Sequence, residues 1–157
     1  MDPEILVDEL ASERTAFFEA LESVADESMI TPGLVGEWSG RDLIAHVGYW
    51  IGHATELIHE VEQGRIDEVG ADQPPTDEVN ATVARIARTT DVETVRRREA
   101  ASFDALVERM RAMDPALLAL TLPDGASVAQ GLREDGAEHY HEHTQELRSA
   151  LSQPTDA

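Results

Sequence analysis

The residues of this chain with the clearest capacity for chemistry are its six histidines, three of which fall within positions 139–143. If this segment is helical, His139 and His143 lie one turn apart on the same face, whereas His141 points to nearly the opposite side and is solvated. Two imidazoles at that spacing can bind one divalent metal ion, with a third ligand from elsewhere in the fold. The pattern therefore predicts His139 and His143 as metal ligands.

His46 is the best candidate for the third ligand because it lies within the apolar run 43–47. An imidazole without a partner is costly in such surroundings. Asp42, one helical turn earlier, is positioned to accept the proton of the other ring nitrogen. His53 shares the helical face of His46 and is expected to play a supporting role at most, while His59 points away. Each histidine also has an ordinary explanation: a single HxxxH pair often arises by chance, and a lone core histidine is more often hydrogen-bonded than metal-bound.

Composition indicates a single domain without disulfides. The 157 residues are 41% hydrophobic and 4% aromatic, and we expect one domain over 1–153 with a disordered tail over 154–157. No apolar stretch approaches the length of a membrane span, and the acidic N-terminus lacks the features of a signal peptide. We therefore expect a cytoplasmic protein. With no cysteine, the strong metal ligands available are His, Asp and Glu.

The charge of the chain restricts its partners. Thirty-two acidic and 12 basic residues give a net charge of −20. Binding of nucleic acids or anionic membranes relies on basic side chains, so we expect neither partner.

Apolar spacing and capping residues predict an all-α fold with four long helices. Ser39 and Asp42 suit the start of the second helix, Thr90 with Glu93 that of the third, and Ser127 with Gln130 that of the fourth. A surface crossover at 65–77 and a shorter helix at 77–88 lie between the second and third. The sequence therefore predicts a four-helix bundle with one long crossover between helices 2 and 3. The long helices are expected over 3–25, 40–64, 90–113 and 127–153.

Two segments resemble motifs of one known family. Residues 36–50 contain Trp38, Asp42 and His46 in the spacing of the DinB-like superfamily signature, which spans a loop and the start of helix 2. Residues 135–143 resemble the HxxxH motif of helix 4 in that family. The resemblance covers almost the whole chain in length, helix order and motif placement.

The resemblance implies a down-up-up-down bundle, often homodimeric, with a metal site formed by His46, His139 and His143. It implies that Trp38 packs the loop onto the bundle. Characterised relatives include mycothiol-dependent maleylpyruvate isomerase and thiol S-transferases, in which a metal-activated low-molecular-weight thiol attacks an electrophile. Three neutral imidazoles with an open position suit Zn²⁺ or Ni²⁺, and also Fe²⁺. The leading hypothesis is a metal-dependent, thiol-dependent S-transferase or isomerase acting on a small electrophile.

Two other functions use the same bundle. A metal-water hydrolase would need the same three histidines, although no general base stands out near His46. A non-catalytic small-molecule-binding or self-resistance protein would need no reaction at all. The carboxylates near the histidine pair are expected on the solvated acidic face: Asp135, Glu138 and Glu142.

Overall fold

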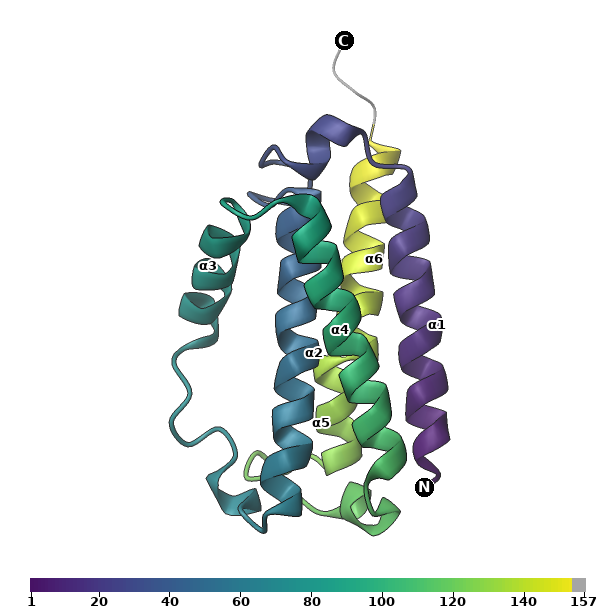
Figure 1. Ribbon diagram of the computed structural model, residues 1–157, viewed down its shortest axis with the longest axis vertical. Helices are drawn as coiled ribbons and strands as arrows, with labels where there is room; N and C mark the ends of the chain where they lie inside the picture. Colours follow the sequence, from purple (N-terminus) through teal and green to yellow (C-terminus); the bar gives the residue numbers. More distant parts are fainter. Residues whose placement is uncertain (154–157) are drawn as a thin grey trace.

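The computed structural model describes residues 1–153, and within them the fold is all-helical, as predicted (Figure 1). The predicted tail at 154–157 lies outside the described residues. The α-helices are α1 (Pro3–Glu22), α2 (Gly40–Glu62), α3 (Thr76–Ala87), α4 (Val92–Ala112), α5 (Val128–Asp135) and α6 (Ala137–Ser152). Short 3-10 helices are η1 (Asp26–Met29), η2 (Ile66–Glu68) and η3 (Pro115–Ala119).

The long helices lie side by side, with α2 packed chiefly against α4 and α1 against α6 (Figure 1). The chain between α2 and α4 contains η2 and α3. It carries α3 along the outer side of α2. No helix within 1–153 combines the length and the apolar character that crossing a membrane requires.

Side-chain caps set where the helices begin. Ser39 caps α2 as predicted and also forms a capping box with Asp42: its hydroxyl accepts from the Asp42 amide at 3.2 Å, and the Asp42 carboxylate accepts from the Ser39 amide at 3.1 Å. Ser127 caps α5 as predicted. The prediction of Thr90 as the cap of the third long helix is wrong: Asp91 is in extended conformation and accepts from the backbone amide of Thr94 at 2.8 Å.

The predicted fourth helix is not continuous, because Gly136 interrupts it. Its backbone (φ −106°, ψ −97°) ends α5 and begins α6. A Cβ atom at this position would lie 2.9 Å from the carbonyl oxygen of Leu132 and 3.0 Å from Leu10, so the close packing around the break requires glycine. The break places Asp135 and His139 on different helices.

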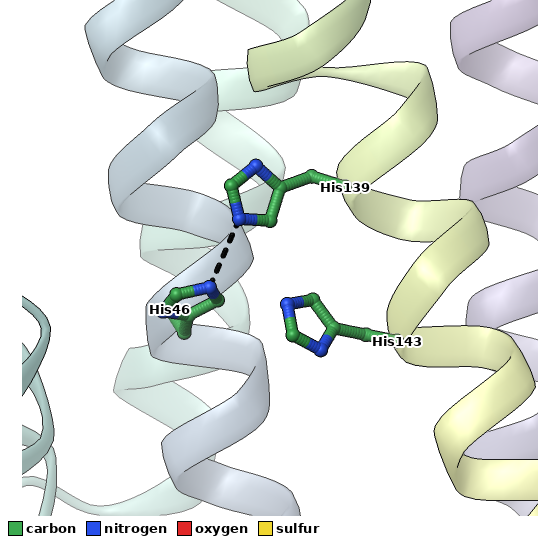
Figure 2. Close-up of side chains that lie close together, drawn as sticks. All are labelled: His46, His139 and His143. Atoms are coloured by element: carbon green, nitrogen blue, oxygen red, sulfur yellow. Dashed lines mark hydrogen bonds between the residues drawn. The ribbon is translucent and has the colours of Figure 1, made fainter. Parts of the chain in front are cut away.

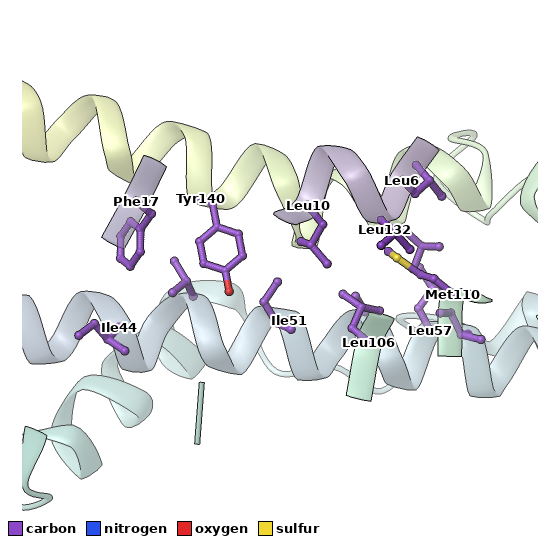
Figure 3. Packing of buried hydrophobic residues seen from close by; sticks show 14 of the residues in the cluster. Leu6, Leu10, Phe17, Ile44, Ile51, Leu57, Leu106, Met110, Leu132 and Tyr140 are labelled. Atoms are coloured by element: carbon purple, nitrogen blue, oxygen red, sulfur yellow. The ribbon is translucent and has the colours of Figure 1, made fainter. Parts of the chain in front are cut away.

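The core lies between the long helices and is largely aliphatic (Figure 3). Burial of these side chains supplies the main driving force for folding. The largest fully buried side chains are Leu10, Phe17, Leu43, Ile44, Ile51, Ile58, Leu106, Met110, Leu132, Tyr140 and Leu147.

One carboxylate is buried inside this core, and its arginine partner is partly exposed. Glu99 of α4 is 1% exposed and accepts two hydrogen bonds from the Arg14 guanidinium of α1, at 2.7 and 2.8 Å. The Tyr140 hydroxyl of α6 also donates to Glu99. The Arg14 guanidinium lies over the rings of Phe18 and Phe103, at 4.8 and 4.6 Å from their centroids. Sequence reasoning missed this network, because Glu99 follows a run of charged residues that reads as a solvated face.

Replacing Arg14 tests how strongly this network holds the helices together. We expect Arg14→Met to lower the free energy of unfolding in urea by about 3–5 kcal/mol, because the buried Glu99 carboxylate loses its counter-charge. The exposed ion pair of Arg111 with Glu4 is the matched control, and Arg111→Met should cost less than about 1 kcal/mol. The double variant Arg14→Met/Glu99→Met should recover much of the loss. Equal, small losses for both arginine variants would contradict this role.

Candidate metal centre

The structure brings the three predicted ligands together (Figure 2). His46 projects from α2, and His139 and His143 project from successive turns of α6 toward it. One ring nitrogen from each histidine lies within 4.8 Å of the other two, and the Nε2 atoms of His46 and His139 are 3.0 Å apart. His46 and His143 are buried, at 5% and 7% exposure, and His139 is half-buried. The geometry is that of a cluster able to hold one metal ion.

Two of the imidazoles are oriented by hydrogen bonds at Nδ1. His139 Nδ1 lies 3.1 Å from the backbone carbonyl oxygen of Glu134, a carbonyl near the end of α5. His143 Nδ1 lies 2.8 Å from a carboxylate oxygen of Glu146. When Nδ1 donates a proton to such an acceptor, Nε2 carries a free lone pair and the ring orientation is fixed, as is usual for metal-binding histidines. The helix break at Gly136 thus contributes directly to the site, since it exposes the carbonyl that orients His139.

The third imidazole does not have the partner that the sequence suggests. His46 Nδ1 is buried without a hydrogen-bond partner among the described residues, and so is Oδ1 of Asp42. The predicted hydrogen bond from His46 to Asp42 is therefore wrong. The Asp42 carboxylate instead serves the capping box with Ser39, and the guanidinium of Arg88 lies 4.0 Å from it. The cap fixes that carboxylate at the first turn of α2, away from the ring one turn later.

The environment disfavours protonation of His46 and His139. Burial, together with the neighbouring His143 and His139, lowers the pKa of His46 from 6.5 to about 3. Burial and the proximity of His143 also lower the pKa of His139. Imidazole binds a metal only in its neutral form. Close packing of the three rings thus favours the state that can coordinate a cation.

Two tryptophans, the only ones in the chain, line the cleft above the cluster. The Trp38 ring centroid lies 4.6 Å from that of His46, so this residue both packs the loop and forms a wall of the site. Trp50 stacks on His139 at 5.8 Å, and its Nε1–H donates to Oδ1 of Asn80 in α3 at 3.0 Å. The cleft has a volume of about 610 Å³. It is large enough for a small organic ligand above the imidazoles.

A second polar pair borders the cleft, and sequence reasoning gave it too little weight. His53 Nδ1 lies 2.6 Å from an Asp135 carboxylate oxygen. Burial is the largest single influence and opposes protonation of His53, but the hydrogen bond and the charge of Asp135, together with Gln73 and Glu56, outweigh it and raise the pKa. Asp135 lines the cleft, which corrects its expected place on the solvated face. Its position one turn before His139, together with His53 on the face of His46, is the signal that could have revealed the pair.

The other two histidines lie outside the cluster, as predicted. His141 is 55% exposed and pairs with Glu13 at 3.0 Å, and His59 is exposed. Glu138 and Glu142 are also exposed, as expected. Helical phase alone therefore separated His141 from its neighbours correctly.

The low pKa of His46 makes the stability of the metal-free protein depend on pH. Because the folded pKa (about 3) lies below the ordinary value of 6.5, the unfolded chain binds the additional proton first as the pH falls. The stability contributed by the neutral ring is thus present above pH 6.5 and is lost progressively toward pH 3. Between pH 7 and pH 5, titration of His46 alone should lower the free energy of unfolding by about 2 kcal/mol.

The measurement is urea unfolding with chelator present, for the wild type and for His46→Gln, which keeps every other titrating group. The wild type should lose more stability than the variant between these two pH values. A difference between the two proteins that stays constant with pH would contradict a depressed pKa at His46.

Comparison with known proteins assigns this chain to a family. The family profile described as "Mycothiol maleylpyruvate isomerase N-terminal domain" matches residues 10–148. No curated protein sequence matches the chain. Among solved structures, the mycothiol-dependent maleylpyruvate isomerase superposes with a TM-score of 0.73 at 16% identity, over 94% of this chain and 61% of that one. An uncharacterised protein from Escherichia coli UTI89 superposes with a TM-score of 0.74 at 12% identity, over 94% and 91% of the two chains.

At these identities the structural matches show the fold, and this chain spans about three fifths of the length of the isomerase. The family profile covers most of the chain. The protein therefore belongs to the mycothiol maleylpyruvate isomerase N-terminal domain family, whose members have the DinB-like fold.

Proposed function

We propose that this protein is a metal-dependent enzyme in which His46, His139 and His143 bind one divalent ion. The reaction is a thiol-dependent S-transfer or isomerisation of a small electrophilic molecule. The single observation that carries the proposal is the convergence of three ring nitrogens within 4.8 Å at a cleft of about 610 Å³. Three imidazoles and an open side facing the cleft are typical of catalytic metal sites.

The donor set fits a borderline divalent ion. Two of the rings have an acceptor at Nδ1, which leaves Nε2 for the metal, and the depressed pKa of His46 keeps that ring neutral. Imidazole nitrogens suit Zn²⁺ or Ni²⁺, and also Fe²⁺. When bound, such an ion would lower the pKa of a thiol or of water and so supply a nucleophile near neutral pH.

The surrounding residues would bind the substrate and handle the proton. Trp38 and Trp50 form apolar walls that limit the access of water to the cluster. The Asp135 carboxylate, held by His53, borders the same cleft and is the group best placed to accept a proton from an incoming nucleophile. This pair supplies the base that the sequence did not reveal.

The thiol is proposed from the family. The profile that matches this chain and one of its structural relatives are both named for a mycothiol-dependent isomerase. This chain has no cysteine, so a thiol would come from a small molecule. The name of that relative includes maleylpyruvate. For this protein we propose only the chemical class, a small electrophile. The pairing of His53 with Asp135 also favours a second candidate, hydrolysis by metal-activated water.

We also propose that the long helical segments keep the down-up-up-down order of the superfamily. A homodimer and a cytoplasmic location remain predictions, as does the absence of nucleic-acid partners.

Metal content tests the site directly. Protein purified without chelator or nickel resin should contain about one divalent ion per chain by elemental analysis. His139→Ala should lose most of it, because two imidazoles bind far more weakly than three. The matched control is His141→Ala on the same helix, which should retain the metal. Substoichiometric metal that is equal in all three proteins would contradict the metalloenzyme and favour the non-catalytic binding protein.

Thiol binding separates the two proposed reactions. Protein loaded with Co²⁺ should develop the near-ultraviolet charge-transfer absorption of a cobalt–thiolate bond when 2-mercaptoethanol is added. His139→Ala should not develop it. If the cobalt protein binds no thiol, thiol activation is wrong, and hydrolysis becomes the function to assay.

A further inference from the structure

The cleft above the histidine cluster is lined by five carboxylates and by no arginine among the described residues. Two arginines on the elements of the cleft are engaged elsewhere: Arg133 with Glu9 at 2.8 Å, and Arg41 with the backbone carbonyl of Thr90 at 3.1 Å. The chain contains no lysine. An anionic ligand would therefore meet no basic side chain on the cleft wall. The five carboxylates are those of Glu37, Glu134, Asp135, Glu142 and Glu146.

Two of the five carboxylates have histidine partners. Asp135 is paired with His53, and Glu146 accepts from His143. The other three are exposed at the rim and form no ion pair within residues 1–153. We call Glu37, Glu134 and Glu142 the rim carboxylates. Their charge exceeds the two positive charges of a divalent ion, so the entrance stays negative when the site is loaded.

The aromatic walls favour the same sign of ligand charge. Trp38 and Trp50 both line the cleft, and the face of an indole ring attracts cations through its quadrupole. Trp50 is held in place by its hydrogen bond to Asn80. Of the remaining polar lining residues, Thr76 and Asn80 on α3 are neutral. Rim and walls thus act together on an approaching ligand.

We propose that the cleft selects small molecules that are positively charged or uncharged, with ammonium-bearing ones preferred, and disfavours mono- and dicarboxylic acids. As a statement about the substrate, this inference rests on the proposed function, because it assigns a charge class to the ligand of that site. The negative potential itself depends only on the rim carboxylates and can be measured without metal or thiol.

Tryptophan fluorescence measures the potential directly, because both tryptophans of the chain line this cleft. Quenching by Cs⁺ relative to iodide should be several-fold stronger for the protein than for free N-acetyltryptophanamide, with acrylamide as the neutral reference. The variant Glu37→Gln/Glu134→Gln/Glu142→Gln should lose most of this preference. The control variant Glu19→Gln/Asp104→Asn/Glu108→Gln removes the same charge from exposed positions outside the cleft, and it should keep the preference.

A thiol series then measures ligand selection on the cobalt-loaded protein. The half-saturating concentration should rise from cysteamine (cationic) through 2-mercaptoethanol (neutral) to mercaptosuccinate (anionic), with about tenfold between the extremes. The rim variant should compress this range and the control variant should not. Each thiol has the same intrinsic acidity in all three proteins, so the comparison isolates the charge of the cleft. Raising the salt to about 0.5 M should compress the range in the wild type as well.

The outcomes distinguish the two proposals. A Cs⁺-to-iodide quenching ratio equal to that of free N-acetyltryptophanamide, or equal losses in the rim and control variants, would overturn the charge selection whatever the protein's reaction. Tightest binding of mercaptosuccinate would overturn it as well. Cation-selective quenching without thiol binding would support the charge class while rejecting the thiol reaction.

Discussion

The Glu99 carboxylate is the point on which the arrangement of the helices depends. It is buried, and it accepts hydrogen bonds from Arg14 of α1 and from Tyr140 of α6. A buried charge requires partners, so the rotation of α6 about its own axis is constrained by the need to bring the Tyr140 hydroxyl to this carboxylate. His139 precedes Tyr140 in the chain. Once Tyr140 faces the core, His139 and His143 face α2 and His46.

The histidine cluster shows how packing prepares a site for a cation. Burial, together with close contact with the two neighbouring rings, disfavours protonation of His46 and lowers its pKa to about 3. The helix break at Gly136 lets the backbone carbonyl of Glu134 orient His139. A continuous helix would use that carbonyl in its own hydrogen-bond ladder. Burial therefore keeps His46 neutral, and the local backbone geometry orients His139 in the same cluster.

The charges around the cleft are arranged in two layers. Close to the imidazoles, Asp135 and Glu146 are paired with His53 and His143. Farther out, the rim carboxylates lie exposed without ion-pair partners in the described part of the chain. In our proposals, the inner layer orients and holds protons, whereas the outer layer acts on ligands before they bind. The high negative charge of the chain thus bears on the site as well as on the surface.

Much of the site was determined by the sequence alone, because helical phase is a local property. The spacing of His139 and His143, the cap at Ser39 and the outward direction of His141 follow from 3.6 residues per turn and from hydrogen bonds within one helix. The apolar run around His46 indicated this residue as the third ligand, and the family motifs supported the same choice. Only the tertiary structure decided the orientation of Asp42, the partnership of His53 with Asp135 and the buried contact of Arg14 with Glu99. These depend on how helices separated by many residues rotate and pack against one another, and no local pattern specifies that rotation.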